Sequence, residues 1–267
     1  MKISISNIIW KKGKNEFAKF IEEVKKNGIF AIELSLNSIF EEPLNMTAKD
    51  FQWLEKQLET ISVSAIHSLT YTRPDLNIFD NTRNELIEYI KFYIKVANKL
   101  GTKNIVFGSA QSRNIKNISK AKADLIFIEF LKELDENLQN NNVFLHIEPL
   151  PKTYCNYLNS FLEGVSLLEN ETFLNIFIQL DIKSIFESDE DIKKIFKYSK
   201  YIKHVHASNP NFEILGNEFA EKHKQIKKLL EDVNYSNFVS GEILNKSGDN
   251  YPLYLQSALE SLKEFYG

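Results

Sequence analysis

Eight short apolar segments alternate with eight longer helical patterns along the whole chain, and this alternation constrains the fold more than any other feature. The apolar segments are rich in Ile, Val and Phe, which is typical of buried strands. They cover residues 3–9, 29–35, 61–68, 104–109, 143–148, 176–181, 201–206 and 237–243. A helical period predicts helices over residues 15–27, 48–59, 82–100, 119–138, 160–170, 189–200, 218–232 and 252–266.

Strands that alternate with helices form right-handed βαβ units and a parallel sheet. Eight such units in 267 residues predict an α/β fold, a closed (β/α)8 TIM barrel, as a single domain over residues 1–267. A doubly wound open sheet is the alternative. The usual nucleotide-binding glycine motifs of that fold do not follow the first apolar segment.

Local signals place two helix ends. Thr47 precedes the second helical pattern and is a suitable N-cap, because its hydroxyl can accept a hydrogen bond from the first turn. Gly101 follows the third pattern, where glycine commonly ends a helix.

Composition limits the classes of function. The formal net charge is −3, so the chain lacks the basic surplus of a general nucleic-acid binder. The single cysteine, Cys155, excludes an internal disulfide and any zinc or iron–sulfur site built from cysteines. Neither a signal peptide nor a membrane-length apolar segment is present, so we expect a cytoplasmic protein without a membrane partner. Some of the many aromatic residues could cover a homo-oligomer face.

Four consecutive predicted strands end in residues that can bind a metal ion: Glu148, Asp181, His206 and Glu242. The carboxyl ends of barrel strands form the active-site face. Three carboxylates meeting there would repel one another, and a divalent cation would relieve that repulsion. Hard oxygen ligands with one imidazole suit Mn²⁺, Mg²⁺ or Co²⁺, and Zn²⁺ is possible. The alternative is that each acid caps a strand end or the next helix.

At this point the motifs resemble a known group, the xylose isomerase-like TIM-barrel superfamily of sugar phosphate isomerases and epimerases. The resemblance covers essentially the whole chain. It is carried by Glu148 in IEPLP, Asp181 in QLDIK, His206 in HVH, Glu242 in SGEI, Glu33 in IELS, His67 in IHSL, and the segment LGTKNIVFGS.

The resemblance implies that Glu148, Asp181, His206 and Glu242 bind one divalent metal ion, with Mn²⁺ first among the choices. It also implies that Glu148 and Glu242 are catalytic and flank the substrate on opposite faces. One would remove the proton α to a carbonyl and the other would return it, through a metal-stabilised enediolate. A single base that moved the proton to the neighbouring carbon would instead give aldose–ketose isomerisation.

Three positions depart from the ketose 3-epimerases of this family. Ser184 stands in place of a histidine, Phe212 in place of an arginine, and Tyr154 in place of a second acid. These departures put simple ketohexose 3-epimerisation in doubt and leave the substrate open.

Other polar residues near strand ends are candidates for contact with a sugar or sugar phosphate: His67, Glu33, Ser109, Arg113, Tyr154, Lys183 and Asn209. Arg113 and Lys183 could meet a phosphate or carboxylate. Glu33 could instead hold a lysine or histidine in place. His146 and His204 should lie one layer below the metal ligands, and His223 falls on a predicted surface helix with no role.

The sequence therefore predicts a metal-dependent isomerase or epimerase of a sugar or sugar phosphate, within carbohydrate metabolism. A metal-dependent polyol dehydratase or lyase remains an alternative, because it would use the same glutamate base. A non-catalytic barrel that binds a sugar or another metabolite is the third possibility.

Overall fold

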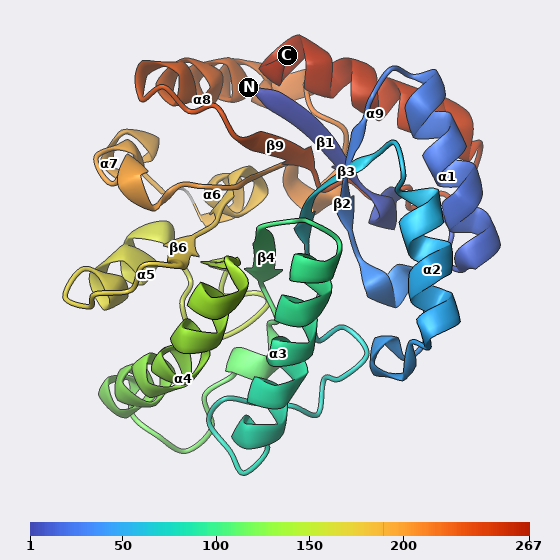
Figure 1. Cartoon of the computed structure of the whole chain (residues 1–267). Coiled ribbons are helices and arrows are strands. Elements are labelled where there is room, and N and C mark those ends of the chain that lie inside the picture. The colour runs from blue at the N-terminus through green and yellow to red at the C-terminus, as the bar shows by residue number, and fades with distance from the viewer. Residues whose placement is uncertain (189) are drawn as a thin grey trace.

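Nine parallel strands form a nearly closed barrel with helices around it, in a computed structural model that describes residues 1–188 and 190–267 (Figure 1). Hydrogen bonds join the strands in the order β6-β5-β4-β3-β2-β1-β9-β8-β7. The strands are β1 (Lys2–Ser6), β2 (Ala31–Leu34), β3 (Ser62–Ile66), β4 (Asn104–Phe107), β5 (Phe144–Ile147), β6 (Ile176–Ile178), β7 (Leu180–Asp181), β8 (Val205–Ala207) and β9 (Phe238–Gly241).

The predicted strand over residues 176–181 is divided into β6 and β7 at Gln179. The backbone N–H of Gln179 donates to the carbonyl of Ile147 on β5, whereas that of Leu180 donates to the carbonyl of His204. The chain therefore changes its pairing partner at Gln179, from β5 on one side to β8 on the other. This stretch completes the ring, so the predicted eight-unit barrel is confirmed.

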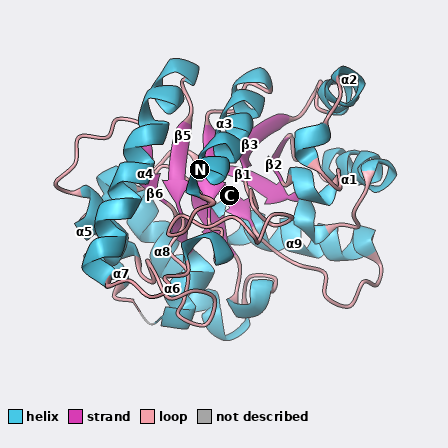
Figure 2. Cartoon of the chain, turned by 90° about the horizontal axis from the view of Figure 1, so that it is seen from below, coloured by secondary structure: helices cyan, strands magenta, loops and turns pink. Residues whose placement is uncertain are grey.

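The first and last strands pair directly, with Lys2 opposite Phe238 and Ile5 opposite Gly241. Apart from the break between β6 and β7, the strands follow one another around the sheet in sequence order, without the reversal of strand order that a doubly wound sheet has at its switch point. The open-sheet alternative is therefore wrong. As a result of this closure the two chain termini lie near each other (Figures 1 and 2).

Helices cover the outside of the barrel (Figure 2). They are α1 (Lys14–Lys26), α2 (Ala48–Gln57), α3 (Arg83–Lys99), α4 (Lys120–Asn141), α5 (Phe161–Leu168), α6 (Ile182–Ser188), α7 (Ile192–Phe196), α8 (Ala220–Asp232) and α9 (Tyr251–Tyr266). On α1, for example, Phe17, Phe20, Ile21 and Val24 are buried, as their helical spacing predicts.

The predicted helix over residues 189–200 is wrong in extent. The structure has two shorter helices, α6 directly after Asp181 and α7 from Ile192. The side chain of Asp191 accepts hydrogen bonds from the backbone N–H groups of Lys193 and Lys194, and so starts α7 as a separate helix. Residue 189, within the predicted helix, lies outside the described residues.

Both predicted helix ends are confirmed. Thr47 caps α2 through a reciprocal pair of bonds with Asp50, in which each side chain accepts from the other's backbone N–H. Gly101 follows α3 with a φ of 69°, a left-handed conformation that glycine adopts without steric cost.

The barrel interior is polar, although branched apolar side chains usually fill this space. Ser4, His146, Gln179, His204 and Ser240 are fully buried there or beside the strands. Each has at least one side-chain atom without a hydrogen-bond partner among the described residues. The apolar core lies instead between the barrel and its helices.

Candidate metal centre

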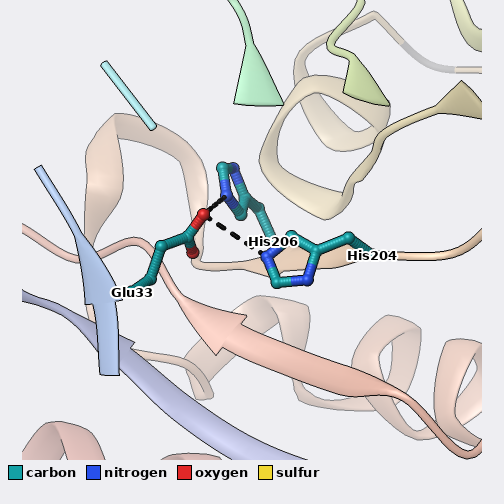
Figure 3. Close-up of side chains that lie close together, drawn as sticks. All are labelled: Glu33, His204 and His206. Atoms are coloured by element: carbon teal, nitrogen blue, oxygen red, sulfur yellow. Dashed lines mark hydrogen bonds and ion pairs between the residues drawn. The ribbon is translucent and has the colours of Figure 1, made fainter. Parts of the chain in front are cut away.

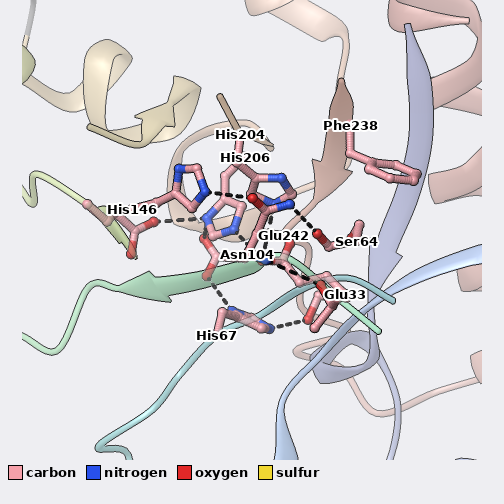
Figure 4. Close-up of polar contacts among 12 residues, drawn as sticks. Glu33, Ser64, His67, Asn104, His146, His204, His206, Phe238 and Glu242 are labelled. Carbon is pink, nitrogen blue, oxygen red and sulfur yellow. Dashed lines mark hydrogen bonds and ion pairs between the residues drawn. The ribbon is translucent and has the colours of Figure 1, made fainter. Parts of the chain in front are cut away.

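Three of the four predicted metal ligands come together at the carboxyl ends of their strands. Glu148 follows β5, His206 lies in β8 and Glu242 follows β9. Nδ1 of His206 is 2.9 Å from Oε1 of Glu148. The same atom is 3.6 Å from Oε2 of Glu242 (Figure 4). One ligand atom of each residue lies within 4.8 Å of the other two, which is the spacing of a group that could hold a metal ion.

Several carboxylates surround the imidazole of His206, and this crowding shifts the pKa values of the group. Burial alone would lower the pKa of His206, but Glu33, Glu242 and Glu148 hold it well above its usual value. Burial alone would raise the pKa of Glu148, but His206 and then Lys183 hold it below its usual value. A single imidazolium cannot neutralise all of these carboxylates, so the donor set fits a divalent cation.

Asp181 lies beside this group rather than within it. Its Oδ2 atom is 3.0 Å from Nζ of Lys183 and also accepts a hydrogen bond from Ser184. Its Oδ1 atom accepts from the backbone N–H of Lys183, in the first turn of α6. Asp181 thus acts partly as a helix cap, which was the alternative reading of an acid at a strand end.

Lys183 is a candidate for meeting a substrate phosphate or carboxylate, but it lies in α6 with only 1% of its surface exposed. Its ammonium sits 4.3 Å from the centre of the Phe212 ring and 5.4 Å from that of Tyr154. Burial would lower the pKa of Lys183, but Asp181, Glu242 and Glu148 raise it, so the side chain stays charged. Its charge compensates the carboxylates of the site.

Arg113 was a candidate for binding a substrate anion, and its position differs from that expectation. The side chain is fully buried, and its Nη2 donates to the backbone carbonyl of Glu148 at 2.8 Å. Burial lowers the pKa of Arg113. Arg113 therefore supports the backbone of Glu148. Because its side chain has no exposed surface and does not line the cavity beside Glu148, it is not placed to contact a ligand there.

Two further substrate candidates are also engaged within the protein. Glu33 is fully buried beneath His206, with Oε1 2.9 Å from Nε2 of that ring. Asn209 donates to the carbonyl of Gly216, and its Oδ1 lies 2.9 Å from Nε2 of His223. Neither side chain has an atom free at the surface to contact a sugar directly.

A cavity of about 340 Å³ adjoins the candidate metal centre. Among the predicted residues, His67, Ser109, Glu148 and Glu242 line it. Nδ1 of His67 lies 3.6 Å from Oε1 of Glu242. A wider cleft near Lys14 and Glu41 lies outside this cluster of glutamates and histidines, so the chemistry points to the smaller cavity.

Sequence reasoning missed three contacts. The hydroxyl of Ser6 lies 2.5 Å from Nε2 of His67, and a Cβ atom at Gly108 would collide with the carboxylate of Glu148. His223, assigned to a surface helix, is fully buried, with Nδ1 2.7 Å from the hydroxyl of Tyr266. A serine within an apolar strand, or a glycine after one, is weak evidence for a functional contact. Both residues occur at such positions for many structural reasons.

A family match covers most of the chain. The family described as xylose isomerase-like TIM barrel matches residues 21–265. The chain belongs to this family. No protein with a curated description matches it.

Solved structures share the xylose isomerase-like barrel at low sequence identity. D-psicose 3-epimerase from Clostridium cellulolyticum H10, solved with D-tagatose, superposes with a TM-score of 0.81 at 19% identity, covering 100% of this chain and 99% of the other. An L-ribulose 3-epimerase gives 0.81 at 16% identity over 100% and 95%. The IolI protein, solved with a zinc atom, gives 0.77 at 16% identity over 100% and 98%.

These similarities establish the xylose isomerase-like fold. The reaction has to be inferred from the residues of this chain. Within the described residues, no helix has the length and apolar character needed to cross a membrane.

Proposed function

We propose that the chain is a divalent-metal-dependent epimerase or isomerase of a sugar. The observation that carries the proposal is the convergence of Glu148, His206 and Glu242, of which the two glutamates also line a cavity. Carboxylate oxygens and one imidazole suit Mn²⁺, with Mg²⁺, Co²⁺ or Zn²⁺ as other occupants. Asp181 is the proposed fourth ligand, and it would be shared with Lys183.

Glu148 and Glu242 are the proposed acid–base pair. Both line the cavity, and they follow different strands, β5 and β9. In this proposal the two carboxylates act on opposite faces of the sugar. Glu148 is ionised at neutral pH because its pKa is held low, and a carboxylate in that state accepts a proton. When bound, the metal ion supplies Lewis acidity that makes a proton next to a carbonyl easier to remove. Glu242 returns a proton to the other face and inverts the centre.

The substrate is proposed to be an uncharged sugar rather than a sugar phosphate. Neither lysine nor arginine is among the described residues that line the cavity. The two cations considered for a phosphate, Arg113 and Lys183, are buried and engaged with Glu148 and Asp181. The lining instead offers hydroxyl, amide and imidazole groups, from Thr70, Ser109, Gln111 and His67, which can bind sugar hydroxyls. The sugar 3-epimerases with the same fold make free ketoses the first substrates to test.

The test is proton exchange by NMR in D₂O, with metal-loaded protein and a panel of free ketoses and their phosphates. We expect deuterium to enter next to the carbonyl of a free ketose, and a new epimer or isomer of equal mass to appear. Glu148→Gln and Glu242→Gln should each lower turnover by about 100-fold or more, because general acid–base catalysis contributes that much. Glu41→Gln, at an exposed position, is the matched control and should keep full activity.

Three results would contradict the proposal in different ways. Full activity in Glu242→Gln would remove its catalytic role. Loss of water from the substrate would indicate a dehydratase. Tight metal and sugar binding without proton exchange for any sugar would indicate a non-catalytic binding protein.

A further inference from the structure

Glu33 lies inside the barrel on the side of His206 away from the other carboxylates. It is on β2, it is fully buried, and its Oε1 is 2.9 Å from Nε2 of His206 (Figure 3). The other ring nitrogen, Nδ1, faces Glu148 and Glu242. The imidazole therefore stands between a buried carboxylate and the candidate metal centre.

An imidazole that binds a metal ion must offer a lone pair on one nitrogen and carry its proton on the other. The carboxylate of Glu33 can accept only from a protonated Nε2, so it selects the tautomer that leaves Nδ1 free. Nδ1 is also the nitrogen that lies 2.9 Å from Glu148. The contact thus sets both the direction and the protonation of the ligand atom.

Neighbouring rings hold the plane of His206. The ring of His67 meets it at 75° with 5.7 Å between centres, and the ring of His204 meets it at 79° with 5.6 Å between centres. Nε2 of His204 also lies 3.3 Å from Oε1 of Glu33 (Figure 3). His204 therefore borders both members of the pair and limits their movement.

A buried carboxylate is costly unless it is paired, so its presence in the barrel interior needs a reason. Glu33 does not line the cavity described above, and its second oxygen has no hydrogen-bond partner among the described residues. Its close polar contacts are to His206 and His204 (Figures 3 and 4). That arrangement suits a group that acts on the metal ligand and not on the substrate.

We infer that Glu33 is a positioning residue that fixes the orientation and tautomer of His206 for metal binding, with His204 packed against the pair. This inference rests on the metal centre of the proposed function. The sequence left two roles open for Glu33, contact with the substrate or support of a lysine or histidine. The inference selects the second role, with His206 as the supported residue.

The experiment measures metal affinity without any substrate. Mn²⁺ affinity is determined by competition titration for wild type, Glu33→Ala and Glu33→Gln. We expect Glu33→Ala to weaken Mn²⁺ binding by about 10- to 100-fold, as loss of a partner of a ligating histidine does. Glu33→Gln should fall between the two, because its amide oxygen still accepts from Nε2–H but carries no charge. Ser4→Ala, which alters another buried polar side chain of the barrel interior, is the control and should bind as wild type does.

A second readout follows the tautomer directly. Nitrogen-15 NMR of the Zn²⁺-loaded protein should show His206 protonated at Nε2 in wild type and in Glu33→Gln. In Glu33→Ala, a mixture of tautomers or a shifted Nε2 signal is expected. If Glu33→Ala fails to fold, Glu33→Gln alone still decides the question through its Mn²⁺ affinity, which should be lower than that of wild type.

The outcomes separate the inference from the proposed function. Unchanged affinity and an unchanged His206 spectrum in a folded Glu33 variant would overturn the positioning role and leave the proposed function intact. Two ions per wild-type chain, with one lost in Glu33→Ala, would overturn it in favour of direct ligation by Glu33. A wild-type protein that binds no divalent metal would overturn the proposed function, and the inference would fall with it.

Discussion

Two contacts hold Glu148 in place. Both come from residues that follow β4, the strand before β5 in the sequence. Gly108, directly after β4, leaves room for the carboxylate only because it has no Cβ atom. Arg113 donates to the backbone carbonyl of the same glutamate. A ligand fixed in this way needs little rearrangement to bind a cation, which favours affinity.

Gly108→Ala tests this close approach. The new methyl group would meet the end of the Glu148 side chain, which can move, so we expect a stability loss of about 1 kcal/mol or less. Displacement of the carboxylate should weaken Mn²⁺ binding by about 10-fold or more. Metal titration and thermal unfolding of the metal-free protein measure the two effects.

Gly164→Ala is the matched control, because the nearest atoms to its Cβ belong to Ile178, away from the metal centre. It should bind Mn²⁺ as wild type does. Wild-type affinity in Gly108→Ala would show that the Glu148 carboxylate has more freedom than the packing indicates.

At the scale of elements, α6 and α8 carry polar residues that contact the segments following the barrel strands. α6 begins directly after β7, so Asp181 and Lys183 lie in a tight turn with no loop between them. α8 carries His223, which lies 2.9 Å from Asn209 and 2.7 Å from the hydroxyl of Tyr266 on α9. His223 thus joins α8 and α9 to the segment after β8.

His223 predicts a pH dependence of stability. Burial lowers its pKa from 6.5 to about 4. Between these values the unfolded chain binds a proton that the folded protein resists, so stability falls as the pH drops from 6.5 toward 4. The full loss from this group is about 3 kcal/mol, reached near pH 4, and no loss occurs above pH 6.5.

Urea unfolding of wild type and His223→Gln between pH 4 and pH 7 measures this effect. Carboxylates contribute to both curves equally, so the difference between the curves isolates His223. The variant should lose less stability on acidification. Parallel curves would mean that the imidazole is protonated in the folded protein without penalty.

At the scale of the whole molecule, the proposed metal ligands come from β5, β7, β8 and β9, and β1 pairs with β9 to close the ring. An ion bound there would link β5 to β7, β8 and β9. These strands lie on the two sides of Gln179, where the chain changes its pairing partner. Binding to the folded state alone stabilises that state by mass action.

Metal removal should therefore lower thermal stability. At a free Mn²⁺ concentration of 100 times Kd, binding adds about 2.7 kcal/mol, which raises Tm by roughly 5–10 °C. Calorimetry with Mn²⁺ and then with excess chelator measures the change. Glu148→Gln, which loses a ligand charge, should show a much smaller shift, and equal shifts in both proteins would argue against a metal ion at this site.

The sequence by itself determined the architecture and the chemical character of the active-site face. Apolar segments and helical periods are local, and parallel strands necessarily bring their carboxyl ends together, so Glu148, His206 and Glu242 could be expected at one rim. Only the tertiary structure decided how those residues are supported. The contact of Glu33 with His206 joins residues 173 positions apart, and the burial of Arg113 depends on how one loop packs behind β5. Such contacts follow from the register and tilt of distant strands, which no local pattern encodes.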